Sequence, residues 1–241
     1  MFSTRDYTNV TSSGKTYDEG LRSYMLKMYN LMAAGLVITG LCAMSVLSFE
    51  PLAELMFGAR GGLTGFGMLI GFSPVLIAMY FFWGYGSLSL EKAQILFWVY
   101  SALTGLSLSG LGLIYTGESI AKTFFITASV FAGMSIYGYS TKKDLTSFGS
   151  FLVMGVMGIL LASLVNLFMQ SPAVHFALSV MGVLIFTGMI AWDTQRLKSY
   201  YYQVGGGVEG QKMAVMGAFT LYLDFINLFL HLLRFMGDRR D

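Results

Sequence analysis

Apolar residues occur along this chain in seven long blocks separated by short polar connectors. The blocks cover residues 29–49, 63–86, 95–115, 123–139, 148–169, 173–192 and 213–235. Each has about the 17–25 residues that a helix needs to cross roughly 30 Å of hydrocarbon. Because backbone groups in lipid must pair within their own segment, each block is predicted to be a transmembrane helix.

This pattern predicts an all-α integral membrane protein in three parts. Residues 1–28 form a polar N-terminal segment, residues 29–236 form the seven-helix domain, and residues 237–241 form a short tail. The first five blocks contain no Asp, Glu, Lys or Arg. The first block is too long for the apolar part of a signal peptide, so it is expected to be a retained span.

Lys and Arg predict the orientation of these spans. With the N-terminus in the cytoplasm, ten of the 15 Lys and Arg residues fall on the inner side, as the positive-inside rule requires. Seven spans then place the C-terminal tail outside, although Arg234, Arg239 and Arg240 favour the inside. A re-entrant last block is the alternative, but the length of that block favours a full crossing.

Composition changes this picture little and excludes several classes of protein. Hydrophobic residues make up 55% of the chain and charged residues 12%, about half the charged fraction of a soluble domain. No basic run indicates a nucleic-acid partner. Cys42 is the only cysteine, and His175 and His231 are the only histidines. With no G-x-S-x-G, P-loop or H-E-x-x-H motif, neither an enzyme nor a bound cofactor is expected. An intramembrane hydrolase, with or without zinc, is a further alternative.

Asp224 is the clearest candidate for chemistry, because an acid inside an apolar span is costly and usually functional. It lies about eleven residues into the last block, roughly 16 Å along the helix. A polar stripe along one helix face includes it. The other members of this stripe are Thr220, Asn227, His231 and Arg234. The stripe predicts ion or proton handling, with Thr220, Asn227 and His231 lining or supporting the path; the alternative is a structural polar network.

Asp193 ends the sixth block and is the second candidate. It is either a solvated acid at the membrane surface or a partner that faces Asp224 across the last helical hairpin. Two carboxylates close together in a low dielectric cannot both ionise freely, so the pair titrates as a unit. Ca²⁺ prefers carboxylate oxygens and would compete with protons for them. Asp193 and Asp224 together therefore predict a Ca²⁺- and proton-binding pair.

Two motifs carry a family resemblance: AWDTQ at residues 191–195 and LYLDFINLF at residues 221–229. Further matching stretches are residues 97–100, 105–109, 114–117 and 137–145. Together they resemble the Bax inhibitor-1 family, in particular its bacterial, YccA-like branch. The resemblance covers the chain from about residue 20.

The resemblance implies a seven-helix fold in which the other six helices surround the last. It implies a pH-sensitive Ca²⁺ leak in a bacterial inner membrane, gated by two aspartates that match Asp193 and Asp224. The alternative that it implies is a regulator without transport activity, bound to a membrane-anchored AAA protease. For that role, residues 1–22 are a candidate recognition tail.

This chain departs from the family pattern at one place. Members of the family often carry an arginine near the inner end of the second helix, able to contact the aspartate pair. Here that stretch, residues 82–86, reads FWGYG, and Arg60 lies at the opposite end of the second block. A contact of the family type is therefore not expected, and gating is predicted to differ.

Overall fold

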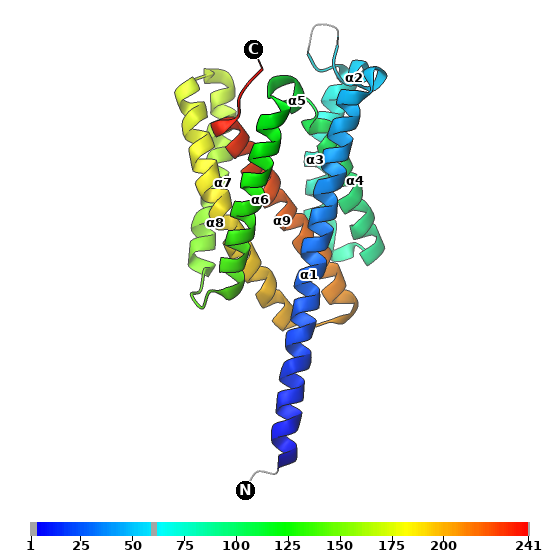
Figure 1. Cartoon of the computed structure of the whole chain (residues 1–241), viewed down its shortest axis with the longest axis vertical. Helices are drawn as coiled ribbons and strands as arrows, with labels where there is room; N and C mark the ends of the chain where they lie inside the picture. Colours follow the sequence, from blue (N-terminus) through cyan, green and yellow to red (C-terminus); the bar gives the residue numbers. More distant parts are fainter. Residues whose placement is uncertain (1–3, 59–61, 241) are drawn as a thin grey trace.

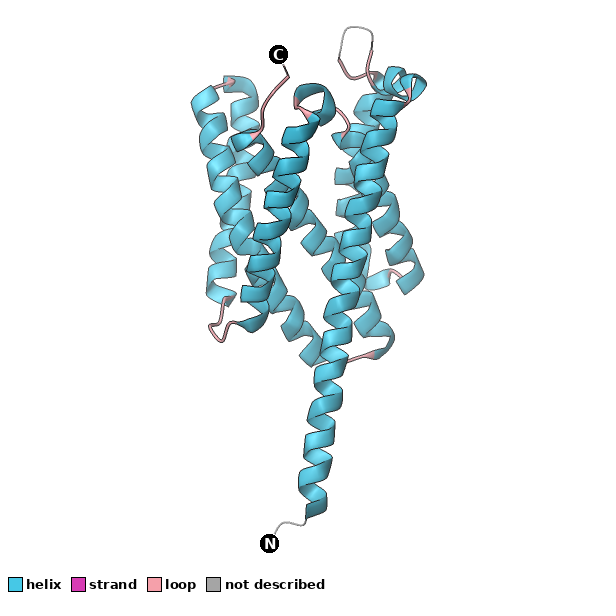
Figure 2. Ribbon diagram, viewed as in Figure 1, coloured by secondary structure: helices cyan, strands magenta, loops and turns pink. Residues whose placement is uncertain are grey.

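The computed structural model describes residues 4–58 and 62–240, with side chains from residue 19 onward except Tyr85. Arg60 lies outside the described residues. The described part is almost entirely helical (Figure 2), and seven of its helical segments are long and apolar enough to cross a membrane. The helices are α1 (Thr4–Ser48), α2 (Glu50–Met56), α3 (Gly65–Gly84), the 3₁₀ turn η1 (Tyr85–Ser87), α4 (Leu90–Leu108), α5 (Leu111–Ile114), α6 (Gly117–Ser140), α7 (Thr146–Met169), α8 (Pro172–Val204) and α9 (Gly207–Met236). The predicted all-α, seven-span fold class is confirmed.

Two helices, α1 and α8, extend furthest beyond the apolar blocks that predicted them. Helix α1 begins at Thr4 and runs well beyond the bundle before it enters it (Figure 1). Helix α8 continues to Val204, twelve residues past the end of the sixth block at residue 192. Polar residues end an apolar block, but they do not end a helix whose backbone hydrogen bonds continue beyond that block.

Capping residues at three connectors explain where helices begin. Ser89, Thr116 and Ser171 each accept a hydrogen bond from the backbone N–H three residues later, at 3.3, 3.2 and 3.5 Å. A side-chain oxygen at this position satisfies an N–H that has no partner within the helix. The short connectors are therefore built from polar residues that start the next span.

Helix α9 is the centre of the bundle. Inside the protein, 72% of its most apolar stretch is buried, against at most 39% for any other span. Helices α1, α4, α6 and α8 pack against it, whereas α7 packs chiefly on α8. The expected central position of the last helix is therefore correct. Helix α7, however, lies further from α9 than is expected if all six other helices surround it.

The two ends of the chain lie at opposite ends of the bundle, and α9 crosses the space between them (Figure 1). The residues after α9 fold against the connection into α6. There Thr116 N–H donates to Asp238 O at 3.1 Å, and Arg240 N–H donates to Ile114 O at 2.9 Å. This arrangement favours the full crossing over the re-entrant alternative.

An aromatic cluster joins α9 to α1, α3 and α4. The Phe219 ring stacks on Phe81 of α3, with centroids 4.3 Å apart, and also contacts Phe97 and Tyr100 of α4. The Tyr222 hydroxyl lies 2.5 Å from the Thr39 hydroxyl of α1. This face of α9 is thus a packed core whose central hydroxyl group has a partner.

Candidate functional site

The site is built on α8 and α9, which form the last helical hairpin. Asp193 is completely buried, and Asp224 is 3% exposed. Asp193 lies within α8 rather than at its end, because the helix continues for three more turns. The interpretation of Asp193 as a solvated surface acid is therefore wrong.

The carboxyl groups of Asp193 and Asp224 lie within hydrogen-bonding range of each other. Apart from the guanidinium of Arg196, no protein donor in the described part of the chain reaches either Asp193 oxygen or Oδ2 of Asp224. Two ionised carboxylates can only repel at this range, since neither can donate. A proton or a cation between them relieves that repulsion.

Arg196 supplies a positive charge at the edge of this pair. Its Nη2 lies 2.5 Å from Oδ1 of Asp193, three residues earlier on α8. The guanidinium also lies over the Trp192 ring at 4.4 Å and near the Tyr200 ring at 5.9 Å. Its side chain is 34% exposed, so Arg196 links the buried pair to the solvent-accessible surface of α8.

Sequence reasoning missed Arg196 as a site residue. The sixth apolar block ends at residue 192, which placed Arg196 in a connector, and the family resemblance indicated the second helix as the source of a basic partner. The spacing of three between Asp193 and Arg196 was the available signal, because residues three apart are neighbours on a helix.

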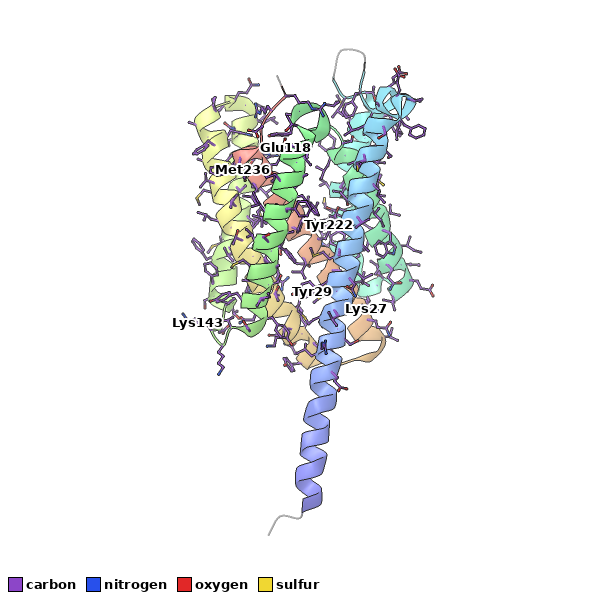
Figure 3. All side chains as sticks on the ribbon, in the orientation of Figure 1. Lys27, Tyr29, Glu118, Lys143, Tyr222 and Met236 are labelled. Carbon is purple, nitrogen blue, oxygen red and sulfur yellow. The ribbon has the colours of Figure 1, made fainter. Side chains whose placement is uncertain are left out.

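A cluster of hydroxyl groups includes Thr194, the residue that follows Asp193 on α8. The Tyr29 hydroxyl of α1 is within reach of Ser135 of α6 and Thr194 of α8. Ser135 and Thr194 are buried, and the Tyr29 side chain points from α1 toward the interior of the bundle (Figure 3). Three helices therefore contribute hydroxyl groups to one buried cluster, which includes the residue after Asp193.

Two glycines allow the neighbouring helices to come close to α8 near Asp193. A Cβ on Gly138 of α6 would lie 2.2 Å from the Ala191 carbonyl oxygen, and one on Gly149 of α7 would lie 2.0 Å from the Trp192 indole. Both approaches require the absence of a side chain. Ala191 and the indole of Trp192 thus pack directly against the backbones of α6 and α7.

Two of the three supporting residues predicted on α9, Asn227 and His231, do not form one cluster with the aspartates. Thr220 is buried, whereas Asn227 is half-buried and donates to Leu223 O of its own helix at 2.8 Å. His231 lies seven residues from Asp224, roughly 10 Å along the helix, and stacks on Phe186. The polar stripe therefore divides into an acidic centre and a separate histidine nearer the C-terminal end.

The site offers few metal ligands. No group of three or more His, Cys, Asp or Glu side chains gathers anywhere in the described residues. A cation between Asp193 and Asp224 would meet the oxygens of two carboxyl groups. That is a small set for Ca²⁺, which takes about six to eight oxygen ligands.

Fold and site together define a multi-pass helical membrane protein with an acidic pair buried beside its central helix. Residues 21–241 match the family model described as inhibitor of apoptosis-promoting Bax1. The chain belongs to this family, the Bax inhibitor-1 family, as the two motifs predicted.

Bacterial relatives cover nearly the whole chain. An uncharacterized protein of Rickettsia prowazekii (strain Madrid E) is 59% identical, over 98% of this chain and 99% of its own length. An uncharacterized protein of Caulobacter vibrioides is 46% identical, over 93% and 92% of the two chains. The inner membrane protein YbhL of Escherichia coli (strain K12) is 44% identical, over 92% and 94%.

Proposed function

We propose that this protein is a pH-sensitive cation leak of the Bax inhibitor-1 type, with Ca²⁺ as the favoured ion. The observation that carries the proposal is the contact between Asp193 and Asp224 inside the bundle. An acid inside a span normally marks an ion or proton path. Here two buried acids from adjacent helices meet.

A site with few ligands suits an ion that passes through the protein better than an ion that stays bound. Two carboxyl groups attract a divalent cation, but the remaining coordination must come from hydroxyl groups and water. An ion held in this way can enter and also leave, which conduction requires. Protons bind the same oxygens, so the occupancy of the pair by Ca²⁺ depends on pH.

Arg196 takes the place of the basic residue that the second helix lacks. While Asp193 is ionised, the guanidinium neutralises it and occupies the inner side of the pair. Protonation of the pair weakens this attraction and frees the arginine, which is already one-third exposed. Gating then depends on one residue of α8 rather than on a contact between α3 and α8.

The proposed setting is the bacterial inner membrane with the N-terminus in the cytoplasm. This orientation follows from the distribution of Lys and Arg, and the relative YbhL carries the description inner membrane protein. Arg196 and the connection between α8 and α9 then face the cytoplasm. The pair senses cytoplasmic pH in this arrangement.

The test is Ca²⁺ flux into proteoliposomes as a function of pH for the wild type, Asp193→Asn and Asp224→Asn. Both variants should lose the pH-dependent part of the flux. Asp144→Asn is the matched control, because Asp144 lies in the exposed connector between α6 and α7. Unchanged flux and pH response in both pair variants would refute the proposal.

The second candidate function is a regulator that binds a membrane-anchored AAA protease. The observation in its favour is the part of α1 before Glu19, which extends beyond the bundle as a helix (Figure 1). Such an arm can be reached by a partner without any change in the bundle. Deleting residues 1–18 should abolish co-purification with the protease and leave Ca²⁺ flux intact; retained co-purification contradicts this role for the arm.

A further inference from the structure

We propose that the groove between α1 and α6 binds one acyl chain of an anionic phospholipid, and that Arg240 holds the phosphate of its headgroup. The groove has a volume of about 510 Å³, within the range of about 300–1,000 Å³ typical of ligand sites. Its floor is the apolar side of α9, at Phe225, Ile226 and Phe229. The proposal concerns a lipid site and is independent of ion conduction.

The walls of the groove are two helices that pack on α9 at a distance from each other. Helix α1 packs on α4 and α9, and α6 packs on α8 and α9. Leu36, Gly40 and Ala43 of α1 face Ile120, Ala121 and Phe124 of α6 across the groove. In Figure 1, α9 is visible between α1 and α6 along this opening.

Two glycines keep the groove open. A Cβ built on Gly40, or on Gly117 at the start of α6, would meet no atom within 4 Å. Both residues line the groove. A side chain could be accommodated at either position, so the room that an acyl chain needs is present in the folded protein.

The lining identifies the occupant as hydrocarbon. Of the side chains that line the groove only Thr39, Ser109 and Arg240 are polar, and the Thr39 hydroxyl is already bonded to Tyr222. Water requires two to four polar partners to stay in a cavity, and this groove does not offer them along its length. Met44 and Phe125 at its edges are 64% and 70% exposed, so the groove opens toward the surrounding lipid.

Arg240 adds the charge that distinguishes an anionic lipid from a neutral one. The tail is fixed where it crosses the end of the groove, since Arg240 N–H donates to Ile114 O at 2.9 Å and Nε donates to Tyr115 O at 3.2 Å. No salt bridge to Arg240 occurs among the described side chains. Its two terminal guanidinium nitrogens can therefore both donate hydrogen bonds to one phosphate, in the bidentate geometry that arginine favours.

The experiment uses the full chain in nanodiscs with trace phosphatidylglycerol that carries a diazirine on its acyl chain. After irradiation, mass spectrometry should locate lipid adducts on the groove segments of α1, α6 and α9. A phosphatidylcholine probe of the same chain length should give several-fold fewer adducts there. Equal labelling by the two probes, or a crosslink between two protein copies in place of a lipid adduct, overturns the proposal.

Two matched pairs of variants test the two halves of the site. Gly40→Phe fills the groove and should reduce labelling several-fold, whereas Gly158→Phe, at an open position on α7, should not. Arg240→Gln should remove the preference for phosphatidylglycerol, whereas Arg239→Gln, whose side chain lies outside the groove, should retain it. Arg240 is exposed, so this second pair decides the question even where Gly40→Phe does not fold. Labelling that is the same in both members of each pair contradicts the proposal.

Discussion

On the face of α9 toward α1, α3 and α4, Phe219 and Tyr222 meet a set of aromatic rings, and the central hydroxyl group is bonded to Thr39. On the face toward α8, Asp224 meets Asp193, and Oδ2 of Asp224 has no protein donor among the described residues. The two faces are only a few residues apart on one helix and equally buried. The first satisfies the rules of a stable core, whereas the second violates them, as functional sites do. Variants on the two faces should therefore have opposite consequences.

The largest loss of stability is expected from Phe219→Ala. This change removes the ring at the centre of the aromatic cluster and should lower the free energy of unfolding by about 3–5 kcal/mol. Unfolding in detergent, followed by circular dichroism, measures it. Phe72→Ala is the control, since Phe72 on α3 is 69% exposed and faces lipid. The comparison fails if both variants lose the same stability.

Asp224→Asn should behave in the opposite way. The amide can donate to Asp193 at every pH, so the repulsion between two carboxylates disappears and about 1–3 kcal/mol of stability is gained where the wild-type pair is ionised. The melting temperature of the variant should therefore depend less on pH than that of the wild type. A variant that is less stable at every pH would show that the pair is structural.

Arg196→Gln tests whether the guanidinium next to Asp193 controls the pH response of the acidic face. Without the guanidinium next to Asp193, the pair holds its proton more tightly, because no positive charge opposes protonation. The midpoint of the pH response of Ca²⁺ flux should move to higher pH by about one unit. Arg22→Gln, at an exposed position on α1, is the matched control. An unmoved midpoint would remove Arg196 from the gating mechanism.

Tyr222→Phe should have the smallest effect. It removes the hydroxyl contact with Thr39, but Thr39 still donates to backbone oxygens, at 2.9 Å from both Gly35 O and Ser101 O. Hydrogen bonds between transmembrane helices contribute about 0.6 kcal/mol on average. A loss of that size, with an unchanged pH response, is expected in the same unfolding and flux measurements. A changed pH response would show that the two faces of α9 are coupled.

The sequence by itself determined the class of the protein, because the apolar blocks are long enough to span a membrane and lipid leaves helix as the only state. It also singled out Asp224, since an acid in such a block stands out without any knowledge of neighbours. The AWDTQ and LYLDFINLF motifs added the family. These features are local, and local patterns can be read from one chain.

The tertiary structure alone decided which residues meet. Asp193 looked like the end of a span, and only the continuation of α8 to Val204 buried it and brought Arg196 onto the same face. Asn227 and His231 shared a stripe with Asp224, yet one bonds to its own helix and the other lies too far away. The groove between α1 and α6 depends on how two distant segments pack on α9. Periodicity fixes the face of one helix, but the neighbour of that face depends on contacts between segments far apart in the chain.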